Sequence, residues 1–343
     1  MSARTKDGEP LLRVEGLRTW FPIKKGVLRR TVGHVRAVDG VDLTISAGKT
    51  TALVGESGCG KTTVGRSILR LIEPTAGSVS FNGQDLLALD SVALRRARQD
   101  IQMVFQDPMT ALDPRMRVRD IVAEGMHSFD IGANEAERTE RVAAMLKRVQ
   151  LDPDYLWRFP HEFSGGQRQR IGIARALAVG PKLLICDEAV SALDVSIQAQ
   201  IINLLAELQA ELGLSYLFIT HDLSVVRYLA EDVCVMYLGQ IVEHAPAEQL
   251  FSAPQHPYTQ GLLAAVPSLD PARRSVEVRV LGDVPSPARP PSGCRFHTRC
   301  PKVFDRCPKE MPELYRVQDG LSRCFLNEGG KQQSRESHLE DEH

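Results

Sequence analysis

Short apolar runs alternate with helically periodic segments through much of the chain. Four of these runs have the length of buried strands: residues 51–54, 183–186, 216–219 and 233–236. Between the second and third runs, apolar residues recur at helical spacing over residues 197–212, and Gly213 supplies a C-terminal cap. Apolar strands that alternate with helices predict an α/β domain built on a parallel sheet.

Other segments have a different character. Residues 107–163 predict two amphipathic helices, at 117–129 and 134–151, without a strand between them, so we expect a helical insertion in the main domain. Residues 11–54 predict short strands and turns, and the proline-rich residues 283–292 predict a stiff, extended linker. The expected divisions are a main domain at 10–253 with its helical part at 107–165, a C-terminal segment and linker at 254–293, a cysteine-rich region at 294–326 and a disordered tail at 327–343.

Composition excludes several classes of protein. The 343 residues are 43% hydrophobic and 25% charged, as in globular proteins, and the formal net charge is −1. A general nucleic-acid groove needs a basic excess, which this chain lacks. No apolar run approaches the roughly 18 residues that span a bilayer, and residues 1–10 have no apolar core typical of a signal peptide. We therefore expect a cytoplasmic chain that binds no nucleic acid.

Residues 55–62 match the phosphate-binding pattern GxxxxGK[ST], preceded by an apolar run and followed by helical spacing. Its glycines let successive backbone N–H groups face phosphate oxygens at a helix N-terminus. Lys61 is expected to reach the β- and γ-phosphates, and the Thr62 hydroxyl to bind Mg²⁺. A chance glycine-rich turn is the alternative, which the strand and helix on either side disfavour. The expected nucleotide contacts are Ser57, Gly58, Cys59, Gly60, Lys61, Thr62 and Thr63.

Two adjacent carboxylates, Asp187 and Glu188, end the apolar run at 183–186. Ligands of open α/β sheets bind at this end of the strands. Asp187 is expected to serve Mg²⁺, directly or through water, and Glu188 to polarise the attacking water as general base. An acidic turn that caps a helix is the alternative.

Ser164, Gly165, Gly166 and Gln167 precede a predicted helix at 168–179. Helix capping alone could explain Ser164, but it does not explain two consecutive glycines, which allow a phosphate to approach the helix N-terminus. Because the first loop already holds the β- and γ-phosphates, this second site requires another nucleotide. A symmetric dimer would supply it.

His221 and Gln106 each follow a predicted strand. His221 is expected to bond the γ-phosphate or the attacking water, although it could be a core histidine. Gln106 is expected to meet Mg²⁺ or water, and it begins the helical insertion, so it could transmit the nucleotide state there.

Taken in this order, the motifs resemble those of the ATP-binding cassette (ABC) family over residues 11–326. The resemblance implies a P-loop NTPase cassette with a RecA-like core, an antiparallel β subdomain and a helical subdomain. It makes residues 164–167 the signature loop and adds Asp194, of the loop at 191–194, as a nucleotide contact. It also implies an aromatic ring stacked on adenine, for which Phe21 is the first candidate and Trp20 the second; either ring could instead be core.

A narrower resemblance comes from residues 105–114, 187–196 and the segment His256-Pro-Tyr258, which look like the F-type ATPase of oligopeptide/dipeptide permeases. It implies ATP-driven import of peptides through a heterodimer with a D-type ATPase, two membrane permeases and an extracytoplasmic peptide-binding protein. The chain would be a peripheral subunit at the cytoplasmic face of a bacterial membrane. The alternatives are a transporter of the same build for nickel or another small solute, and a non-transport ABC ATPase.

The last four cysteines, Cys294, Cys300, Cys307 and Cys324, are separated by 5, 6 and 16 residues. The spacing matches neither the close pairs of zinc ribbons nor the short ferredoxin runs, so it indicates four thiolate ligands without identifying the metal. The family resemblance implies a [4Fe-4S] cluster, with zinc as the lesser alternative. We expect a structural role, because too little apolar sequence surrounds the cysteines to fold alone; a redox sensor is the alternative.

Overall fold

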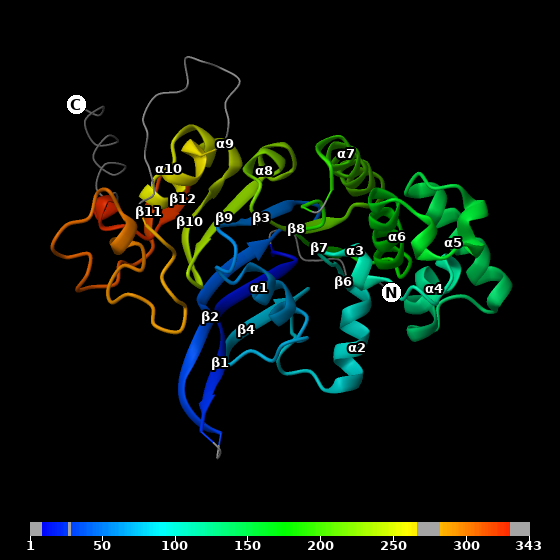
Figure 1. The fold of residues 1–343 in the computed structure, drawn as a ribbon, viewed down its shortest axis with the longest axis horizontal. Coiled ribbons are helices and arrows are strands. Elements are labelled where there is room, and N and C mark those ends of the chain that lie inside the picture. The colour runs from blue at the N-terminus through cyan, green and yellow to red at the C-terminus, as the bar shows by residue number, and fades with distance from the viewer. Residues whose placement is uncertain (1–8, 27–28, 192, 266–281, 330–343) are drawn as a thin grey trace, which may run out of the picture.

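The computed structural model describes residues 9–26, 29–191, 193–265 and 282–329, which form two sheets and the helices around them (Figure 1). An eight-stranded sheet has the order β11-β12-β10-β9-β3-β8-β7-β6, and a four-stranded sheet has the order β2-β1-β4-β5. The strands of the large sheet are β3 (Thr50–Val54), β6 (Ile101–Val104), β7 (Leu183–Asp187), β8 (Ser215–Thr220), β9 (Asp232–Tyr237), β10 (Gln240–Pro246), β11 (Tyr315–Val317) and β12 (Gly320–Ser322).

Strands β9, β3, β8, β7 and β6 are parallel, as the apolar runs predict. Every residue of β3, β7 and β8 is buried, because both faces of this sheet are covered. Alternate residues enter different cores: Leu183 and Ile185 face the antiparallel sheet, whereas Leu184 and Cys186 face the helical region. The helices over these faces are α1 (Lys61–Ile68), α2 (Ser91–Asp100), α7 (Val195–Leu212) and α8 (Leu223–Leu229).

The helical insertion is present at one end of the molecule (Figure 1). Its helices are α3 (Pro108–Ala111), α4 (Val118–Ser128) and α5 (Glu135–Arg148), with 3-10 turns at Pro153–Trp157 and Pro160–Glu162, and α6 (Gly165–Leu177) follows it. The predictions of helices at 117–129 and 134–151 are confirmed by α4 and α5. Asn134 caps α5 by accepting a hydrogen bond from the Glu137 N–H. No helix in the described part of the chain is long and apolar enough to cross a membrane.

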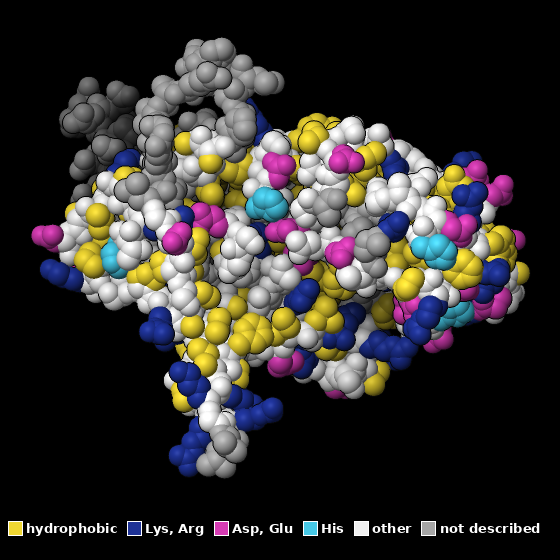
Figure 2. All heavy atoms as spheres, in the orientation of Figure 1, with side chains coloured by type: hydrophobic (Ala, Val, Ile, Leu, Met, Phe, Trp, Pro, Cys, Tyr) yellow, Lys and Arg dark blue, Asp and Glu magenta, His cyan; other side chains and the backbone are white. Residues whose placement is uncertain are grey.

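The antiparallel sheet differs from the short strands expected for residues 11–54. Its strands are β1 (Leu12–Lys25), β2 (Arg30–Ile45), β4 (Ala76–Phe81) and β5 (Gln84–Asp85). Strand pairing runs from Leu12 with Ile45 out to Lys25 with Arg30, so residues 23–25 and 30–35 lengthen the two strands of one hairpin. The hairpin projects from the body, and Lys and Arg side chains gather at its end (Figures 1 and 2). β-branched residues and antiparallel pairing sustain it where little core lies beneath.

The C-terminal segment is built into the large sheet. Strand β12 pairs with β10, placing Ser322 opposite Glu243. Phe296 is buried in the same core as helices α9 (Ala247–Ser252) and α10 (Pro257–Ala264). Single 3-10 turns lie at His297–Arg299 and Phe325–Asn327. The linker at 283–292 lies against β2, where the Pro287 carbonyl accepts a hydrogen bond from the Arg36 N–H at 3.2 Å. Most of the tail predicted at 327–343 lies outside the described residues.

Candidate nucleotide site

The phosphate loop connects β3 to the first turn of α1. Gly60 precedes that helix with φ 112°, and a Cβ there would lie 2.1 Å from the Ala37 carbonyl oxygen, so only glycine fits. The Lys61 ammonium donates to the carbonyls of Gly55 at 2.8 Å and Glu56 at 3.0 Å, and its residue is 4% exposed. The lysine therefore lies along the inner side of the loop.

Strand β7 delivers the predicted carboxylates beside this loop. The Thr62 hydroxyl donates to Asp187 Oδ1 at 2.8 Å, although the two residues are 125 positions apart. Burial raises the pKa of Asp187, and the hydrogen bond from Thr62 opposes this effect. The structure therefore brings together the hydroxyl and the carboxylate that the sequence assigns to Mg²⁺.

Glu188 joins the two other predicted catalytic residues. Its Oε2 accepts a hydrogen bond from Gln106 Nε2 at 2.7 Å, and its Oε1 lies 3.3 Å from His221 Nδ1. Glu188 has φ 48°, in the left-handed region, which is uncommon for a side chain of this size. Its side chain is 12% exposed and that of His221 is 54% exposed. Glu188 and His221 also line a cavity of about 300 Å³ with Gly55, Glu56 and Ser57.

The signature loop forms the N-terminus of α6. The Ser164 hydroxyl accepts from the Gln167 N–H at 3.3 Å, and Gln167 Oε1 accepts from the Ser164 N–H at 3.0 Å, so a capping box begins the helix. A Cβ on Gly166 would lie 2.4 Å from Ile197 Cγ2 of α7, whereas a Cβ on Gly165 would meet only Leu193 at 3.5 Å.

The sequence argument assigned both glycines of this loop to the approach of a phosphate. The structure gives Gly166 a packing reason of its own, because no side chain fits between it and Ile197. Only Gly165 has room for a methyl group within the chain, and thus only Gly165 keeps an approach of phosphate as its specific reason. Residues 164–167 do not line the cavity beside the phosphate loop.

The remaining predicted nucleotide contacts are the aromatic ring for adenine and Asp194. Trp20 is occupied, because its Nε1 donates to Asp39 Oδ1 at 3.1 Å and the Arg36 guanidinium lies 4.9 Å from its ring centre. Phe21 is 39% exposed and is the freer of the two rings. Asp194 precedes α7 as its capping residue, with no side-chain hydrogen bond to the helix.

All four C-terminal cysteines line one small cavity. Burial raises the pKa of Cys294 to about 12 and that of Cys324 to about 11, and the other thiols of the group contribute in the same direction. Among the residues that the structure describes, no three His, Cys, Asp or Glu side chains are spaced to hold a metal ion together. The structure thus supports the grouping of the thiols, but it does not establish the metal site that the sequence predicted.

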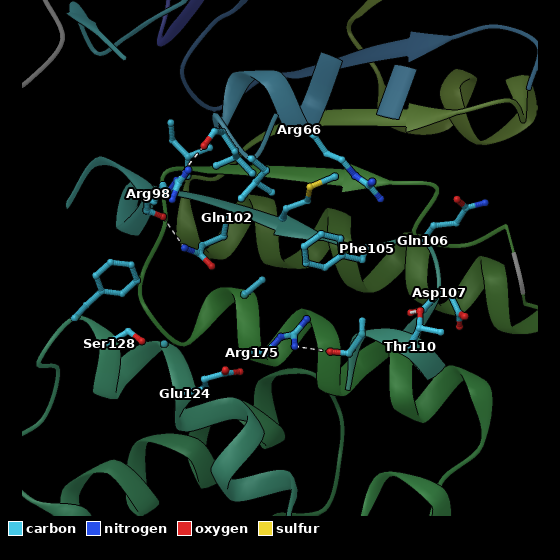
Figure 3. A pocket seen from close by; sticks show the side chains of 18 residues that line it. Arg66, Arg98, Gln102, Phe105, Gln106, Asp107, Thr110, Glu124, Ser128 and Arg175 are labelled. Atoms are coloured by element: carbon cyan, nitrogen blue, oxygen red, sulfur yellow. Dashed lines mark hydrogen bonds between the residues drawn. The ribbon is translucent and has the colours of Figure 1, made fainter. Parts of the chain in front are cut away.

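A larger groove of about 730 Å³ separates β6 from the helical insertion (Figure 3). Phe105 points into it, Arg66 and Arg98 line it from the side of the main sheet, and Arg175 lines it from α6. Gln106 lines the same groove and donates to Glu188. One side chain therefore connects this groove with the carboxylate of the nucleotide site.

Sequence reasoning missed two partners of the phosphate loop. The Tyr258 hydroxyl accepts a hydrogen bond from the Glu56 N–H at 2.9 Å, and the Arg299 guanidinium bonds both oxygens of the Glu56 carboxylate. The segment His256-Pro-Tyr258 was noticed only as a family resemblance, and nothing in the local pattern marks Arg299.

Comparisons with known proteins agree with this geometry. Residues 38–191 match the family described as ABC transporter, and residues 242–307 match the family described as oligopeptide/dipeptide transporter, C-terminal region. A putative peptide import ATP-binding protein of Brucella ovis is 51% identical, covering 93% of this chain and 98% of its own. The oligopeptide transport ATP-binding protein AppF of Bacillus subtilis is 51% identical over 89% of this chain and 94% of its own. The dipeptide transport ATP-binding protein DppF of Haemophilus influenzae is 46% identical over 95% and 99%.

Solved structures give the same assignment of fold. CbiO1 from Clostridium perfringens, part of an ABC transporter complex, superposes with a TM-score of 0.60 at 29% identity, covering 71% of this chain and 91% of its own. A dimeric post-hydrolysis state of the ATP-binding cassette MJ0796, bound to ADP and phosphate, gives a TM-score of 0.61 at 27% identity, covering 69% and 98%. The chain therefore belongs to the ATP-binding subunits of ABC transporters, in the branch that carries the oligopeptide/dipeptide transporter C-terminal region.

Proposed function

We propose that this chain is the ATP-hydrolysing subunit of an importer of dipeptides or oligopeptides. The observation that carries the proposal is one cluster of side chains. Glu188 accepts a hydrogen bond from Gln106 and faces His221, and beside it the Thr62 hydroxyl donates a hydrogen bond to Asp187. The relatives named for peptide, oligopeptide and dipeptide import cover nearly the whole chain and supply the substrate class.

The residues of the cluster have separate roles in this proposal. Lys61 neutralises phosphate charge, and Thr62 and Asp187 hold Mg²⁺. Glu188 accepts a proton from the attacking water, because its carboxylate is oriented by Gln106 and His221 rather than left to rotate. His221, which is half exposed, is placed to donate to the γ-phosphate. The other expected nucleotide contacts are Phe21, Ser57, Gly58, Cys59, Gly60, Thr63, Ser164, Gly165, Gly166, Gln167 and Asp194.

A second ATPase subunit completes each site. The N-terminus of α6 carries the anion-binding groups of the signature loop, and it does not line the cavity of the chain's own phosphate loop. We therefore infer that it meets the nucleotide held by a partner, and the resemblance of residues 105–114 and 187–196 to F-type subunits makes a D-type ATPase the proposed partner. Closure of this dimer on ATP and its reopening after hydrolysis would drive transport.

The groove of Figure 3 is the proposed binding site for a membrane permease subunit. It is large, it is lined by Arg66, Arg98 and Arg175, and it shares Gln106 with the catalytic cluster, so nucleotide chemistry and permease contact can influence each other. We place the chain as a peripheral subunit at the cytoplasmic face of a bacterial membrane, under two permeases that receive peptide from an extracytoplasmic binding protein. The cassette in this proposal is residues 10–253, with 107–165 as helical subdomain and 254–326 as C-terminal region.

The four cysteines are the proposed ligands of a [4Fe-4S] cluster. They line one cavity, which fits a shared ligand set. The spacing of the cysteines along the chain matches neither the close pairs of zinc ribbons nor the short ferredoxin runs, so the choice of iron–sulfur over zinc rests on the family resemblance. An absorption spectrum and metal analysis of anaerobically purified protein test the assignment, and a colourless sample with stoichiometric zinc would overturn it.

Glu188→Gln tests the proposed catalysis. The amide keeps the size of the side chain but cannot accept the proton, so we expect hydrolysis to fall by a factor of about 10² to 10⁴ while ATP still binds. The variant should accumulate as a closed dimer with its partner ATPase, measured by size exclusion with and without ATP. Hydrolysis at the parent rate would refute the role of Glu188, and failure of the parent to co-purify with membrane permeases would refute the transport assignment.

A further inference from the structure

The phosphate loop is bonded to the C-terminal region through one residue, Glu56. Its backbone N–H donates to the Tyr258 hydroxyl at 2.9 Å. Its carboxylate receives two hydrogen bonds from Arg299, Nη1 to Oε2 at 2.7 Å and Nη2 to Oε1 at 3.0 Å. This parallel, two-pronged geometry fixes orientation as well as charge. Arg299 is 243 positions away in the sequence, so the contact joins the phosphate loop to the cysteine-rich segment near the C-terminus.

The ion pair is sheltered on the arginine side. The Arg299 side chain is 7% exposed and that of Glu56 is 27% exposed. The other donors of the guanidinium are also used, because Nε donates to the Gly282 carbonyl at 3.2 Å and Nη1 lies 3.5 Å from the Tyr237 hydroxyl. Arg299 is therefore held in one place, and the hydrogen bonds with Glu56 raise its pKa.

The position of Arg299 depends on the packing of the cysteine-rich segment. Arg299 lies between Phe296, which is 1% exposed, and Cys300. The Phe296 ring packs against Tyr237 and Tyr258 with ring centres 5.3 Å apart in each case. Phe296 and Cys300 both line the four-cysteine cavity. A change in that cavity would therefore move the guanidinium that holds Glu56.

Glu56 places a negative charge in a loop that must bind a polyanion. Its backbone carbonyl also accepts from the Lys61 ammonium at 3.0 Å, so its N–H, its carbonyl and its carboxylate are all engaged. Removing Arg299 would free the side chain and leave its charge uncompensated beside the phosphate site, where charge is poorly screened.

We propose that Arg299 is a positioning residue, which fixes and neutralises Glu56 so that the packing of the cysteine-rich segment sets the affinity of the phosphate loop for ATP. The proposal rests on the function proposed above. It assigns the C-terminal region a task in nucleotide binding, separate from any contact with a partner subunit.

The test compares the affinity for a fluorescent ATP analogue among variants of the full chain, purified anaerobically. Arg299→Gln should raise the dissociation constant about tenfold and change kcat less than threefold. Arg299→Lys keeps the positive charge but cannot make the two parallel hydrogen bonds, so its dissociation constant should lie between those of the parent and Arg299→Gln. Adding Glu56→Gln to Arg299→Gln should recover at least threefold of the lost affinity, because it removes the uncompensated charge. A merely structural role for Arg299 predicts no such recovery.

Arg306→Gln is the matched control. Arg306 precedes Cys307 as Arg299 precedes Cys300, but it pairs with Glu310 and Glu328 rather than with the phosphate loop. The dissociation constant of Arg306→Gln for the ATP analogue should stay within twofold of the parent value. Metal content and unfolding midpoint are measured in parallel for all variants.

Three outcomes would overturn the inference. They are an Arg299→Gln affinity within twofold of the parent value, a double variant as weak as Arg299→Gln alone, and an Arg306→Gln loss equal to that of Arg299→Gln. A parent chain that does not bind ATP would instead overturn the proposed function, so the two failures are distinguishable.

Discussion

Alanine substitution of the two glycines of the signature loop should affect different properties: Gly166→Ala the stability of the fold, and Gly165→Ala the rate of ATP hydrolysis. On Gly166 the new methyl group would lie 2.4 Å from Ile197 Cγ2, so α6 and α7 must move apart or Ile197 must leave its rotamer. Overpacking of this kind costs about 1–3 kcal/mol, and the better helix propensity of alanine returns at most about 1 kcal/mol. Taking the middle of the overpacking range, about 2 kcal/mol, less about 1 kcal/mol for helix propensity, we expect Gly166→Ala to lower the free energy of unfolding by about 1 kcal/mol.

On Gly165 the methyl group would meet only Leu193, at the ordinary contact distance of 3.5 Å. We expect the free energy of unfolding of Gly165→Ala to stay within about 0.5 kcal/mol of the parent value, as for substitutions that create no clash. Hydrolysis in the assembled transporter should nevertheless fall tenfold or more, about 1.4 kcal/mol in the barrier, because in the proposed dimer the methyl group would occupy the approach to the partner's nucleotide.

Urea unfolding of the isolated chain and ATP hydrolysis by the assembled transporter separate these effects. Ile197→Ala provides the matched control, because it removes the methyl group that clashes. Adding Gly166→Ala to Ile197→Ala should therefore lower the free energy of unfolding less than adding Gly166→Ala to the parent chain. Full hydrolysis by Gly165→Ala, or an undiminished free energy of unfolding for Gly166→Ala, would refute the division of roles between the two glycines.

Three further predictions concern separate parts of the chain. Phe21→Ala should weaken ATP binding by about 1–3 kcal/mol, as base–aromatic stacking contributes elsewhere, and Phe21→Tyr should preserve it; equal affinities for both variants would remove Phe21 from the adenine site. Burial raises the pKa of Cys59, so its thiol stays protonated at neutral pH. The rate of its alkylation, measured by peptide mass spectrometry, should therefore still increase above pH 9. A rate that levels off below pH 9 would contradict this. With the proposed [4Fe-4S] cluster, Cys307→Ser should lower both the iron content and the unfolding midpoint, whereas an iron content equal to that of the parent would exclude Cys307 as a ligand.

Local patterns were sufficient to predict most of the catalytic cluster. Asp187 and His221 each follow a short apolar run, Thr62 follows the phosphate loop after a third run, and the ends of neighbouring parallel strands meet at one edge of a sheet. The helices of the insertion were predictable for a similar reason, since amphipathic spacing and an asparagine cap are written in consecutive residues.

Contacts between distant segments were not predictable in this way. The pairing of Glu56 with Arg299 and the contact of Gly166 with Ile197 join residues that share no local pattern. The length of strands β1 and β2 was not predicted, because their outer parts are stabilised by pairing with each other rather than by a buried face with a clear alternation.

The short strands β11 and β12 have a consequence for how the protein avoids aggregation. An unpaired strand at the rim of a sheet is a template for other chains, and natural proteins keep such rims short. Here one rim is β11, with three residues, and the other is β6, with four. A chain truncated before β11 would expose the seven-residue β10 and its apolar side chains as a new rim. Such a truncation is expected to self-associate through β10 even when its nucleotide site is intact, so loss of activity after removal of the C-terminus would not by itself identify a role for the cysteines.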